Sequence, residues 1–588
     1  MPSFTKRTHT CGQLRASDIG TTITLNGWVD TRRDLGGVIF IDLRDRYGIT
    51  QIVFRPEKEP IAHQAAKDLR SEYVISVTGI VEARPEGTAN PELETGDIDV
   101  LGMSVTVLNK ADTPPFQIED KTEASEDIRL KYRYLDLRRR SLLKNFEVRH
   151  RMYQITHKFF DERGLLEVET PVLMKSTPEG ARDYLVPSRV QHGKFYALPQ
   201  SPQTYKQILM VAGFDRYVQI VKCFRDEDLR ADRQQEFTQI DVEMSLIDES
   251  DIQSLAEGLM KVLLKAIKGV DLALPLPRMT YKEAMETYGS DKPDTRFEMK
   301  LHCVNPLVES CGFRVFSDSV KKGGIVAGFV VPGGASFTRN QMDNLVEYTK
   351  SLGVGGLVYF KWTENGLETA VEKFLGKELV QSIATDMGAE RGDLVLLVSD
   401  AWQKTYTVLG TLRLELGRRL NLVNEGRSDL LWVTDFPMFE FSEEEQRYVA
   451  MHHPFTAPKP EDIPLLESNP ALARARAYDL VLNGNEVAGG SIRIHDSGLQ
   501  KQVFKLMGIE EEEALQKFGF LINAFRFGAP PHGGIAFGFD RLAMLLTGTK
   551  SIRDVIAFPK TASAVSLMDD APGSVDEKQL RELHIRIV

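Results

Sequence analysis

The chain has 588 residues, roughly two to four times the length of an ordinary single domain, so we expect several domains. Its 42% hydrophobic and 27% charged residues are typical of a globular protein and exclude fibrous and disordered classes. The 84 acidic and 73 basic residues give a net charge of −11, which argues against binding a polyanion through bulk charge.

The cysteines and apolar segments bear on where the protein works. Cys11, Cys223, Cys303 and Cys311 are scattered and form no CxxC pair, which excludes a disulfide framework and a CxxC zinc site. No apolar run approaches the roughly 18 residues of a membrane span, and the first residues lack a signal-peptide core. We therefore expect a cytoplasmic protein with no membrane partner.

Residues 1–108 are predicted to form a small β-barrel. Short runs of alternating apolar residues, separated by Gly, Pro and Asp clusters, extend from Thr22 to about Val107, with one helix-like stretch, IAHQAAKDL. Five strands with a helix are typical of the OB-fold. Residues 109–135, with two adjacent prolines and little periodicity, are predicted to be a hinge.

The remainder is predicted to be an α+β domain with an insertion. Near-helical spacing of apolar residues predicts one long basic helix, from Arg129 to a stop at Gly164. Alternating strands and helices follow, which favours an antiparallel sheet over residues 136–292. We interpret the Gly-rich stretch 293–422 as an inserted α/β domain, residues 423–560 as the second part of the sheet domain, and residues 561–588 as a C-terminal extension.

Two clusters of residues could carry chemistry. In FRDE, followed by a polar loop and EFTQID, Arg225 at a strand end can grip a phosphate and Phe237 can stack on a base. In GGIAFGFDRLAM, glycines allow a nucleotide to approach the backbone and Arg541 can reach a phosphate. The alternatives are a charged surface hairpin and a core strand packed on a buried helix. P-loop and Rossmann fingerprints are absent from the sequence.

Together with EVETPVL, in which a strand ends at Pro171, these clusters resemble motifs 1, 2 and 3 of the class II aminoacyl-tRNA synthetases, in that order. The segments KSTPEGARDY, ALPQSPQTYKQ, AMHHPFT and NGNEVAGGSIRIH are similar to the bacterial type of aspartyl-tRNA synthetase. The likeness covers the whole chain, and the inserted region resembles the so-called GAD domain. It implies that ATP and L-aspartate form aspartyl-adenylate and pyrophosphate, and that aspartate then passes to the 3′-terminal adenosine of tRNA for aspartate.

The resemblance also implies the residues of the active site. Those with a catalytic role would be Arg225, Glu486 and Arg541. Those that contact ATP would be Arg225, Asp226, Glu227, Gln234, Phe237, Glu486, Gly538, Phe539, Asp540 and Arg541. Those that contact aspartate would be Glu179, Gln203, Lys206, Arg225, Asp241, His452 and Arg493. Arg493 would receive the side-chain carboxylate in a bidentate fork that asparagine cannot satisfy.

By the same resemblance, Asp479 and Glu486 would hold Mg²⁺ through carboxylate oxygens, which are the hard ligands this ion prefers. The Asn-Gly pair of DLVLNGNEV predicts a two-residue hairpin turn, so Val481 would face Glu486, with Asp479 two residues back on the same face. Taken individually, both carboxylates are more typical of a solvated surface. The neighbouring residues His452 and His453 are not expected to share a metal, because adjacent strand residues point to opposite faces.

For the barrel, the resemblance implies that Phe40 stacks on an anticodon base while Arg33 and Gln51 contact base edges. The alternative for Phe40 is core packing. Leu35 and Gly87 match positions that separate family members charging only tRNA for aspartate from those also charging tRNA for asparagine. Leu35 resembles the strict type and Gly87 the relaxed type, so the sequence leaves this discrimination open.

The resemblance further implies a homodimer, with the long helix and Pro171 at its interface. One alternative is a relative charging asparagine or lysine, which the cationic Arg493 disfavours. Another is a catalytically silent tRNA-binding paralogue, which would have lost Arg225, Glu486 or Arg541. The distribution of charge is compatible with tRNA, because residues 129–151 hold nine basic and two acidic residues beside the predicted hinge.

Overall fold

The computed structural model describes residues 5–177, 181–227, 233–443 and 446–588. The chain divides into two compact units, Met1–Glu147 with Arg553–Gly573, and Val148–Ile552 with Ser574–Val588. The last part of the chain is therefore shared between both units. Within the described ranges, no helix is both long and apolar enough to cross a membrane.

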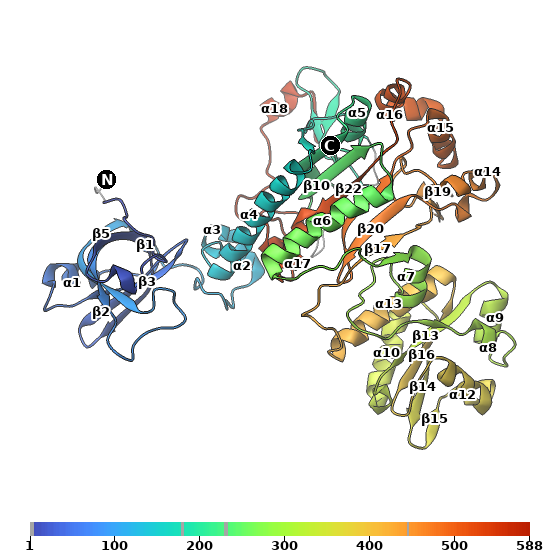
Figure 1. The fold of residues 1–588 in the computed structure, drawn as a ribbon, viewed down its shortest axis with the longest axis horizontal. Coiled ribbons are helices and arrows are strands. Elements are labelled where there is room, and N and C mark those ends of the chain that lie inside the picture. The colour runs from blue at the N-terminus through green and yellow to red at the C-terminus, as the bar shows by residue number, and fades with distance from the viewer. Residues whose placement is uncertain (1–4, 178–180, 228–232, 444–445) are drawn as a thin grey trace. The chain divides into compact units, whose positions relative to one another are not determined.

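The N-terminal unit contains a closed five-stranded barrel, which confirms the predicted OB-fold (Figure 1). Its strands follow the order β1-β2-β3-β5-β4, and β1 closes the barrel by pairing with β4. The alternating residues of these strands fill the core, and the helix α1 (Pro60–Ala66) lies between β3 and β4 in the chain. The strands are β1 (Thr22–Leu35), β2 (Val38–Asp45), β3 (Gly48–Phe54), β4 (Val74–Ala83) and β5 (Ile98–Asn109).

The prediction of one long basic helix is wrong at its beginning. The stretch forms three helices, α2 (Glu126–Lys131), α3 (Arg133–Asp136) and α4 (Arg140–Asp161). The buried Arg133 donates hydrogen bonds to the backbone oxygens of residues 553, 556 and 557 and pairs with Asp136 at 2.7 Å. These tertiary bonds draw on a distant segment and outweigh the local helical pattern.

The second unit is built on an eight-stranded sheet with the order β11-β17-β20-β21-β22-β10-β9-β6. The predicted antiparallel pairing holds in its interior, while the outer pairs β11 with β17 and β6 with β9 are parallel. Helices α6 (Glu249–Lys268) and α17 (Phe539–Thr547) pack on it, as Figure 1 shows, and α5 (Gln203–Val211) packs on β9 and β10. The strands are β6 (Leu166–Glu167), β9 (Arg216–Phe224), β10 (Glu236–Ser245), β11 (Arg278–Thr280), β17 (Leu430–Thr434), β20 (Ala477–Leu482), β21 (Asn485–Ile492) and β22 (His532–Gly538).

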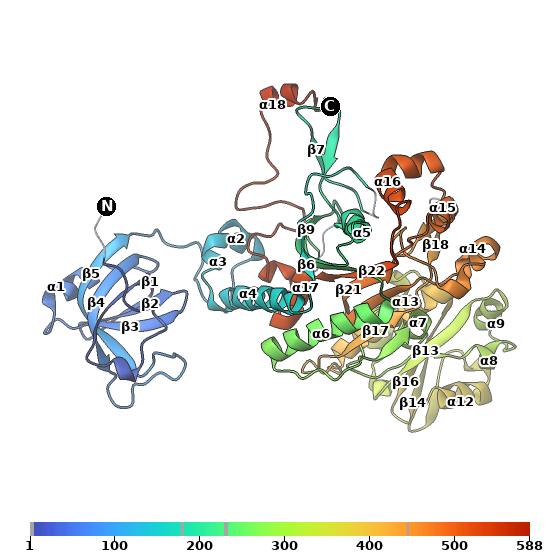
Figure 2. The same cartoon turned by 45° about the horizontal axis from the view of Figure 1, so that its top comes forward.

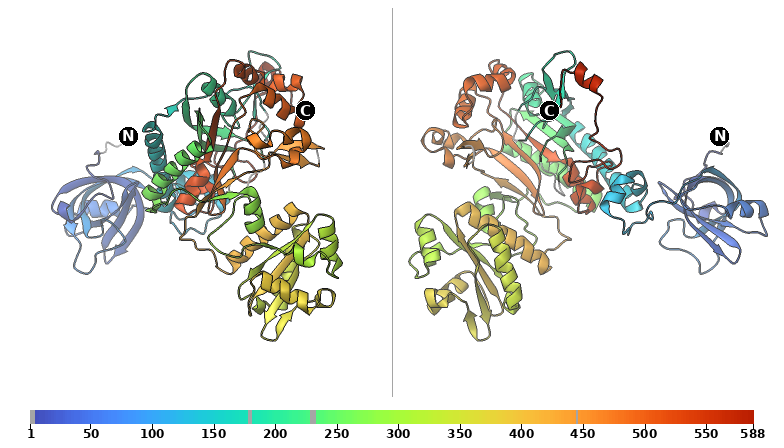
Figure 3. Two further views of the ribbon diagram at one scale, coloured as in Figure 1. Left: turned by 45° about the vertical axis from the view of Figure 1, so that its right-hand side comes forward. Right: turned by 180° about the vertical axis from the view of Figure 1, so that it is seen from behind.

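The region predicted as an insertion forms its own antiparallel sheet with helices on either side (Figure 3). The strand order is β12-β13-β16-β14-β15, and two hydrophobic clusters cover its two faces. The strands are β12 (His302–Cys303), β13 (Ile325–Val331), β14 (Val358–Thr363), β15 (Gly366–Glu368) and β16 (Leu394–Asp400). The helices are α8 (Asn305–Val308), α9 (Arg314–Lys321), α10 (Arg339–Ser351), α11 (Glu372–Leu375), α12 (Lys377–Asp386) and α13 (Trp402–Arg419).

Smaller elements surround the main sheet. They are β7 (Leu185–Pro187), β8 (Phe195–Ala197), α7 (Tyr281–Tyr288), β18 (Phe439–Ser442), β19 (Arg447–Ala450), α14 (Leu465–Ser468), α15 (Ser497–Leu506), α16 (Glu511–Phe525) and α18 (Glu577–Glu582). In Figure 2 the helix α18 lies near the β7–β8 hairpin. Arg189, in the turn of that hairpin, forms an ion pair of 2.6 Å with Glu582 of α18.

Candidate active site

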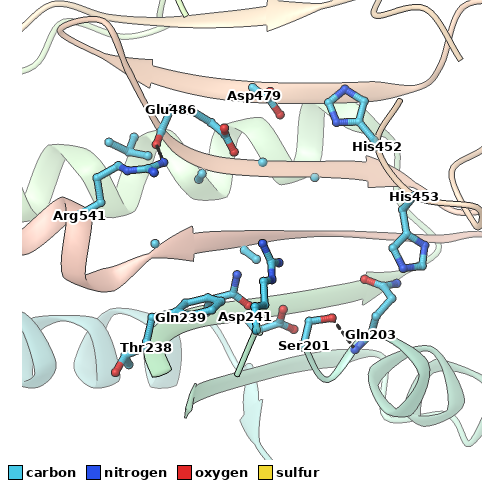
Figure 4. A pocket seen from close by; sticks show the side chains of 18 of the residues that line it. Ser201, Gln203, Thr238, Gln239, Asp241, His452, His453, Asp479, Glu486 and Arg541 are labelled. Atoms are coloured by element: carbon cyan, nitrogen blue, oxygen red, sulfur yellow. Dashed lines mark hydrogen bonds between the residues drawn. The ribbon is translucent and has the colours of Figure 1, made fainter. Parts of the chain in front are cut away.

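A cavity of about 480 Å³ lies over the central strands of the main sheet, within the size range typical of small-molecule sites. Residues of α5, β10, β20, β21, β22 and α17 line it (Figure 4). The structure brings these predicted residues together around it: Gln203, Lys206, Arg225, Glu227, Gln234, Phe237, Asp241, His452, Asp479, Glu486, Arg493, Gly538, Asp540 and Arg541. Glu179, also predicted to be here, lies outside the described residues.

Two cations and two anions form a buried cluster at one end of the cavity. Lys206 Nζ lies 2.9 Å from Asp241 Oδ1 and 3.3 Å from Glu243 Oε2. Arg493 donates from Nε and Nη2 to the two Glu243 oxygens, at 3.1 and 3.2 Å, and from Nη1 to Ser491 Oγ at 2.8 Å. Each of the four charged residues is at most 5% exposed. The cluster has no formal net charge, because each buried cation is paired with a buried anion before any ligand binds.

Glu243 is the member of this cluster that sequence reasoning missed. Asp241 and Glu243 are two residues apart on β10, so their side chains point to the same face of the sheet. Although burial acts in the opposite direction, Arg493 and Lys206 hold the pKa of Glu243 below its ordinary value. Burial raises the pKa of Asp241 to about 6, against the opposing effect of Lys206. Glu243 is therefore the firmer anion of the two.

Arg225 and Phe237 lie at the other side of the cavity, where β9 ends and β10 begins. The Arg225 guanidinium carbon lies 5.2 Å from the centroid of the Phe237 ring, a cation–π distance. Glu227, also predicted to contact ATP, forms an ion pair with Arg233, with 3.3 Å between Glu227 Oε2 and Arg233 Nη1. Asp226 does not line the cavity and instead lies 3.6 Å from Arg182. This side presents a cation beside an aromatic face, which suits a phosphate next to a base.

Arg541 lies in the first turn of α17 and reaches back to the sheet. Its Nη1 donates a hydrogen bond to the backbone oxygen of Glu486 at 2.8 Å, which Figure 4 draws as a dashed line. This bond connects the predicted motif 3 helix to the strand that carries Glu486. In Figure 4, Arg541 lies at the end of the cavity away from Gln203 and His453.

Asp540 links three segments that are far apart in sequence. Its carboxylate accepts the backbone N–H of Thr238 at 2.7 Å and pairs with Arg149 of α4 at 2.6 Å. The preceding Phe539 is fully buried, with its ring 4.4 Å from that of Tyr153, and it does not line the cavity. Any contact of Phe539 with a nucleotide therefore falls to its backbone.

Asp479 and Glu486 approach each other over Gly489. The hairpin has the predicted turn and the predicted pairing of Val481 with Glu486, and a bulge before Val481 places Asp479 opposite Gly489. A Cβ atom at Gly489 would lie 2.8 Å from Asp479 Oδ1 and 3.3 Å from Glu486 Oε1. Burial and the nearby Glu486 both raise the pKa of Asp479. Two crowded carboxylates fit a divalent cation, which would relieve their repulsion.

The fit to Mg²⁺ depends on ligands from outside the protein. Among the described residues, no group of three or more His, Cys, Asp and Glu side chains is arranged to hold a metal ion. A two-carboxylate site is nevertheless usual for Mg²⁺, which keeps several waters and shares substrate phosphates.

The two adjacent histidines occupy different parts of the cavity, as Figure 4 shows. His452 is exposed and packs edge-on against Phe436, with ring centroids 4.5 Å apart. His453, which sequence reasoning did not select, accepts the backbone N–H of Phe455 at Nδ1, which leaves its proton on Nε2. Burial, with the nearby Arg493 and Lys206, lowers the pKa of His453 to about 3, so the ring is neutral. Its buried Nε2 has no partner among the described residues and is available to a ligand.

The predicted anticodon residues lie in a different part of the chain, on the barrel. Arg33 and Phe40 are cross-strand neighbours, and Arg33 Nη2 donates to Gln51 Oε1 at 3.1 Å and to Asp42 Oδ1 at 3.0 Å. Phe40 is partly exposed, so it is not confined to the barrel core. Leu35 is 62% exposed at the end of β1. Gly87 lies between β4 and β5 with a positive φ of 79°.

Comparison with known proteins gives two matching families. Residues 125–562 match the family of tRNA synthetases class II (D, K and N), and residues 23–101 match the OB-fold nucleic acid binding domain. Among similar curated proteins are the aspartate–tRNA ligase of Macrococcus caseolyticus (strain JCSC5402), 55% identical, and the aspartate–tRNA(Asp/Asn) ligase of Caldanaerobacter subterraneus subsp. tengcongensis, 53% identical. Each alignment covers 99% of this chain and 98% of the relative.

Solved structures share the fold. An asparaginyl-tRNA synthetase from Pyrococcus horikoshii, complexed with asparaginyl-adenylate, matches with a TM-score of 0.58 and 18% identity over 94% of this chain and 98% of that chain. A putative aspartyl-tRNA synthetase from Leishmania major Friedlin matches with a TM-score of 0.59 and 18% identity, over 95% of this chain and 94% of that one. Because the family match spans well over half of its length, the chain belongs to the class II tRNA synthetases (D, K and N) and is an aminoacyl-tRNA synthetase.

Proposed function

We propose that this chain is an aspartate–tRNA ligase, and that the buried cluster of Lys206, Asp241, Glu243 and Arg493 is its aspartate receptor. The observation that carries the proposal is the cation pair at the end of the cavity. Arg493 is hydrogen-bonded to the buried residues Glu243 and Ser491 and lies beside Lys206, so these bonds orient its remaining N–H groups. A carboxylate matches these donors, whereas the amide nitrogen of asparagine would place donor against donor.

The amino group of the substrate has its own acceptors. Asp241 supplies a carboxylate beside the cavity, and Gln203 supplies an amide close to it. The neutral His453, with its unpartnered Nε2 proton, can donate to a substrate oxygen without adding charge. The receptor would therefore hold the ammonium group and the side-chain carboxylate of aspartate at separate partners and set the α-carboxylate toward Arg225.

In the first reaction an α-carboxylate oxygen attacks the α-phosphorus of ATP, the bond to the bridging oxygen breaks, and pyrophosphate leaves. Both reactants are anions, so the contribution of the protein is positioning and charge neutralisation. Arg225 lies where it can hold the α-phosphate against the carboxylate while Phe237 stacks on the adenine, and Arg541 reaches toward the γ-phosphate. Glu227 and Gln234 would add contacts to the nucleotide, as would the backbone around Gly538.

Mg²⁺ is the cation that we assign to Asp479 and Glu486. When bound there, it would neutralise phosphate charge and orient the departing pyrophosphate. The two carboxylates are already close to each other over Gly489, so little reorganisation of the protein is needed to hold it.

In the second reaction the 3′-hydroxyl of the terminal adenosine of tRNA attacks the aspartyl carbonyl, and AMP leaves. The hydroxyl proton would pass to an oxygen of the departing phosphate, so no dedicated protein base is required. Meanwhile Phe40 would stack on an anticodon base and Arg33 and Gln51 would contact base edges. In this assignment residues 1–108 read the anticodon, 109–135 are the hinge, 136–292 and 423–560 perform the chemistry, 293–422 are the insertion and 561–588 the C-terminal extension.

We further propose a homodimer. Strand β6 is the outer strand of the sheet, and a groove of about 460 Å³ lies between it and α4. Leu166, Val172 and Leu173 nearby are each at least half exposed. An unpaired edge with exposed apolar side chains fits a second copy of this chain. We also propose a cytoplasmic location, which the substrates ATP and tRNA and the four cysteines without disulfide bonds support.

One experiment tests the activity and the choice of tRNA. The purified protein should catalyse aspartate-dependent exchange of pyrophosphate into ATP, with asparagine and lysine inactive. Aminoacylation of tRNA for aspartate and tRNA for asparagine, run side by side, separates the strict type suggested by Leu35 from the relaxed type suggested by Gly87. Absence of aspartate-dependent exchange would overturn the proposal.

A further inference from the structure

The two connections that lead into and out of the insertion both contact one turn of the main sheet. This turn is Asn483–Gly484, which joins β20 to β21. We propose that it is a joint through which the insertion sets the positions of Asp479 and Glu486. The inference rests on the proposed function, because it assigns the inserted domain a role in ATP binding at that site.

The outgoing connection is hydrogen-bonded to one residue of the turn, Asn483. Asn483 Oδ1 accepts the backbone N–H of Asp429 at 2.8 Å, and Asn483 Nδ2 donates to the backbone oxygen of Arg427 at 2.9 Å. The backbone of Asn483 also donates to the Asp429 oxygen at 3.0 Å. Three hydrogen bonds thus tie one turn residue to the segment leaving the insertion.

The incoming connection packs on the second residue of the turn. A Cβ atom at Gly484 would lie 3.0 Å from Asp294 Cβ, so the two segments are in direct contact. Asp294 is held by Arg296 through bonds of 2.8 and 3.0 Å. Thr295 Oγ1 donates to Asp429 Oδ2 at 3.1 Å, which joins the incoming connection to the outgoing one.

The same incoming connection is fixed to the insertion at its other end. Arg413 of α13 donates to the backbone oxygens of Met299 at 3.0 Å, Phe297 at 2.7 Å and Glu298 at 2.9 Å. Its guanidinium carbon also lies 3.9 Å from the centroid of the Phe297 ring. A displacement of α13 would therefore be transmitted through Arg413 to the incoming connection, and from there through Thr295 and Asp429 to the turn.

The turn has two residues, and Glu486 follows it after one further residue. Asn483 and Gly484 have left-handed φ values of 52° and 77°, as a two-residue turn of this kind requires. The strands leaving it carry Asp479 and Glu486, whereas the aspartate cluster lies on α5, β10 and the segment after β21. Movement of the joint should therefore change ATP and Mg²⁺ binding and leave aspartate binding unchanged.

The test is Asn483→Gly. Glycine adopts the left-handed conformation readily, so the turn is retained while both side-chain hydrogen bonds to the outgoing connection are lost. We expect the KM for ATP in pyrophosphate exchange to rise on the order of fivefold, with the KM for aspartate unchanged. Calorimetric titration with ATP, with and without Mg²⁺, should show that Mg²⁺ strengthens ATP binding less in the variant.

Asn421→Gly is the matched control, because Asn421 is exposed, has a left-handed φ of 53° like that of Asn483, and is not one of the residues that contact the turn. Its ATP and aspartate constants should equal those of the wild type. A variant Asn483→Gly that behaves like this control, or that raises both KM values equally, would overturn the joint. Failure of the wild type to exchange pyrophosphate would instead overturn the proposed function, and the ATP titrations would still test the joint.

Discussion

Replacement of Arg493 by leucine tests the aspartate receptor most directly. The guanidinium makes three hydrogen bonds of 2.8 to 3.2 Å and is 5% exposed, so leucine removes a buried cation and changes the cluster from neutral to a net charge of −1. Glu243 would keep Lys206, at 3.3 Å, as its remaining cation in the cluster. Breaking a buried pair in this way lowers the free energy of unfolding by about 3 to 5 kcal/mol.

The effect on catalysis follows from the bonds that a substrate carboxylate would lose. Two charge-assisted hydrogen bonds contribute about 1.5 to 3 kcal/mol each, so kcat/KM for aspartate should fall by roughly two to four orders of magnitude. Pyrophosphate exchange measures this loss, urea denaturation confirms that the variant is folded, and calorimetry should show ATP binding retained. Arg493→Lys, which keeps the charge without the fork, should be the more stable of the two variants. Exchange kinetics of the folded leucine variant within a few-fold of the wild type would refute the receptor.

Three further changes probe other parts of the chain. Phe40→Ala should weaken tRNA charging by about 1 to 3 kcal/mol, the usual contribution of base stacking, and spare pyrophosphate exchange; equal loss in both assays would contradict an anticodon role. Gly489→Ala places a methyl group 2.8 Å from Asp479 Oδ1, so half-maximal exchange should require more Mg²⁺, and an unchanged Mg²⁺ titration would argue against the carboxylate site. Because the pKa of Asp241 is raised to about 6, the KM for aspartate should rise as the pH falls below 6, and a flat profile from about pH 7 to 5 would exclude Asp241 as the ammonium ligand.

The raised pKa of Asp241 also makes the free energy of unfolding depend on pH in a definite direction. The folded state binds the proton more tightly than the unfolded state, in which the ordinary value is 3.8. The stabilisation from this group is therefore fully present below about pH 4 and is lost as the pH rises through about 6. Asp241→Asn should remove this pH dependence from denaturation curves measured between those limits.

Much of the fold and of the cavity could be predicted because the signals are local. Alternation of apolar residues identified the barrel strands, and the Asn-Gly pair identified the turn between β20 and β21 with its pairing of Val481 and Glu486. Glu243 could have been found from its position two residues after Asp241, since both must share one face of β10. It was missed because a strand carboxylate is ordinarily solvated, and its partner Arg493 is 250 positions away in the sequence.

The features that could not be predicted depend on distant segments. The helical pattern continues through residue 132, yet the helix is broken there because Arg133 binds backbone oxygens more than 400 residues later. The bulge that sets Asp479 opposite Gly489 likewise has no local signal in the β20 sequence. Phe539 and Arg541 lie two residues apart on α17, so their side chains leave the helix in nearly opposite directions. The Phe539 ring packs on Tyr153, whereas Arg541 lines the cavity.

The contact of Arg133 with residues 553–557 constrains how the protein is made. The N-terminal unit includes a segment that leaves the ribosome about 400 residues after Glu147, which at usual elongation rates is a delay on the order of tens of seconds. Until then the guanidinium of Arg133 lacks its three backbone acceptors. The barrel can close early, but α3 can complete its packing only when translation is almost finished. A fragment ending near residue 147 would therefore keep the barrel and leave α3 without these contacts.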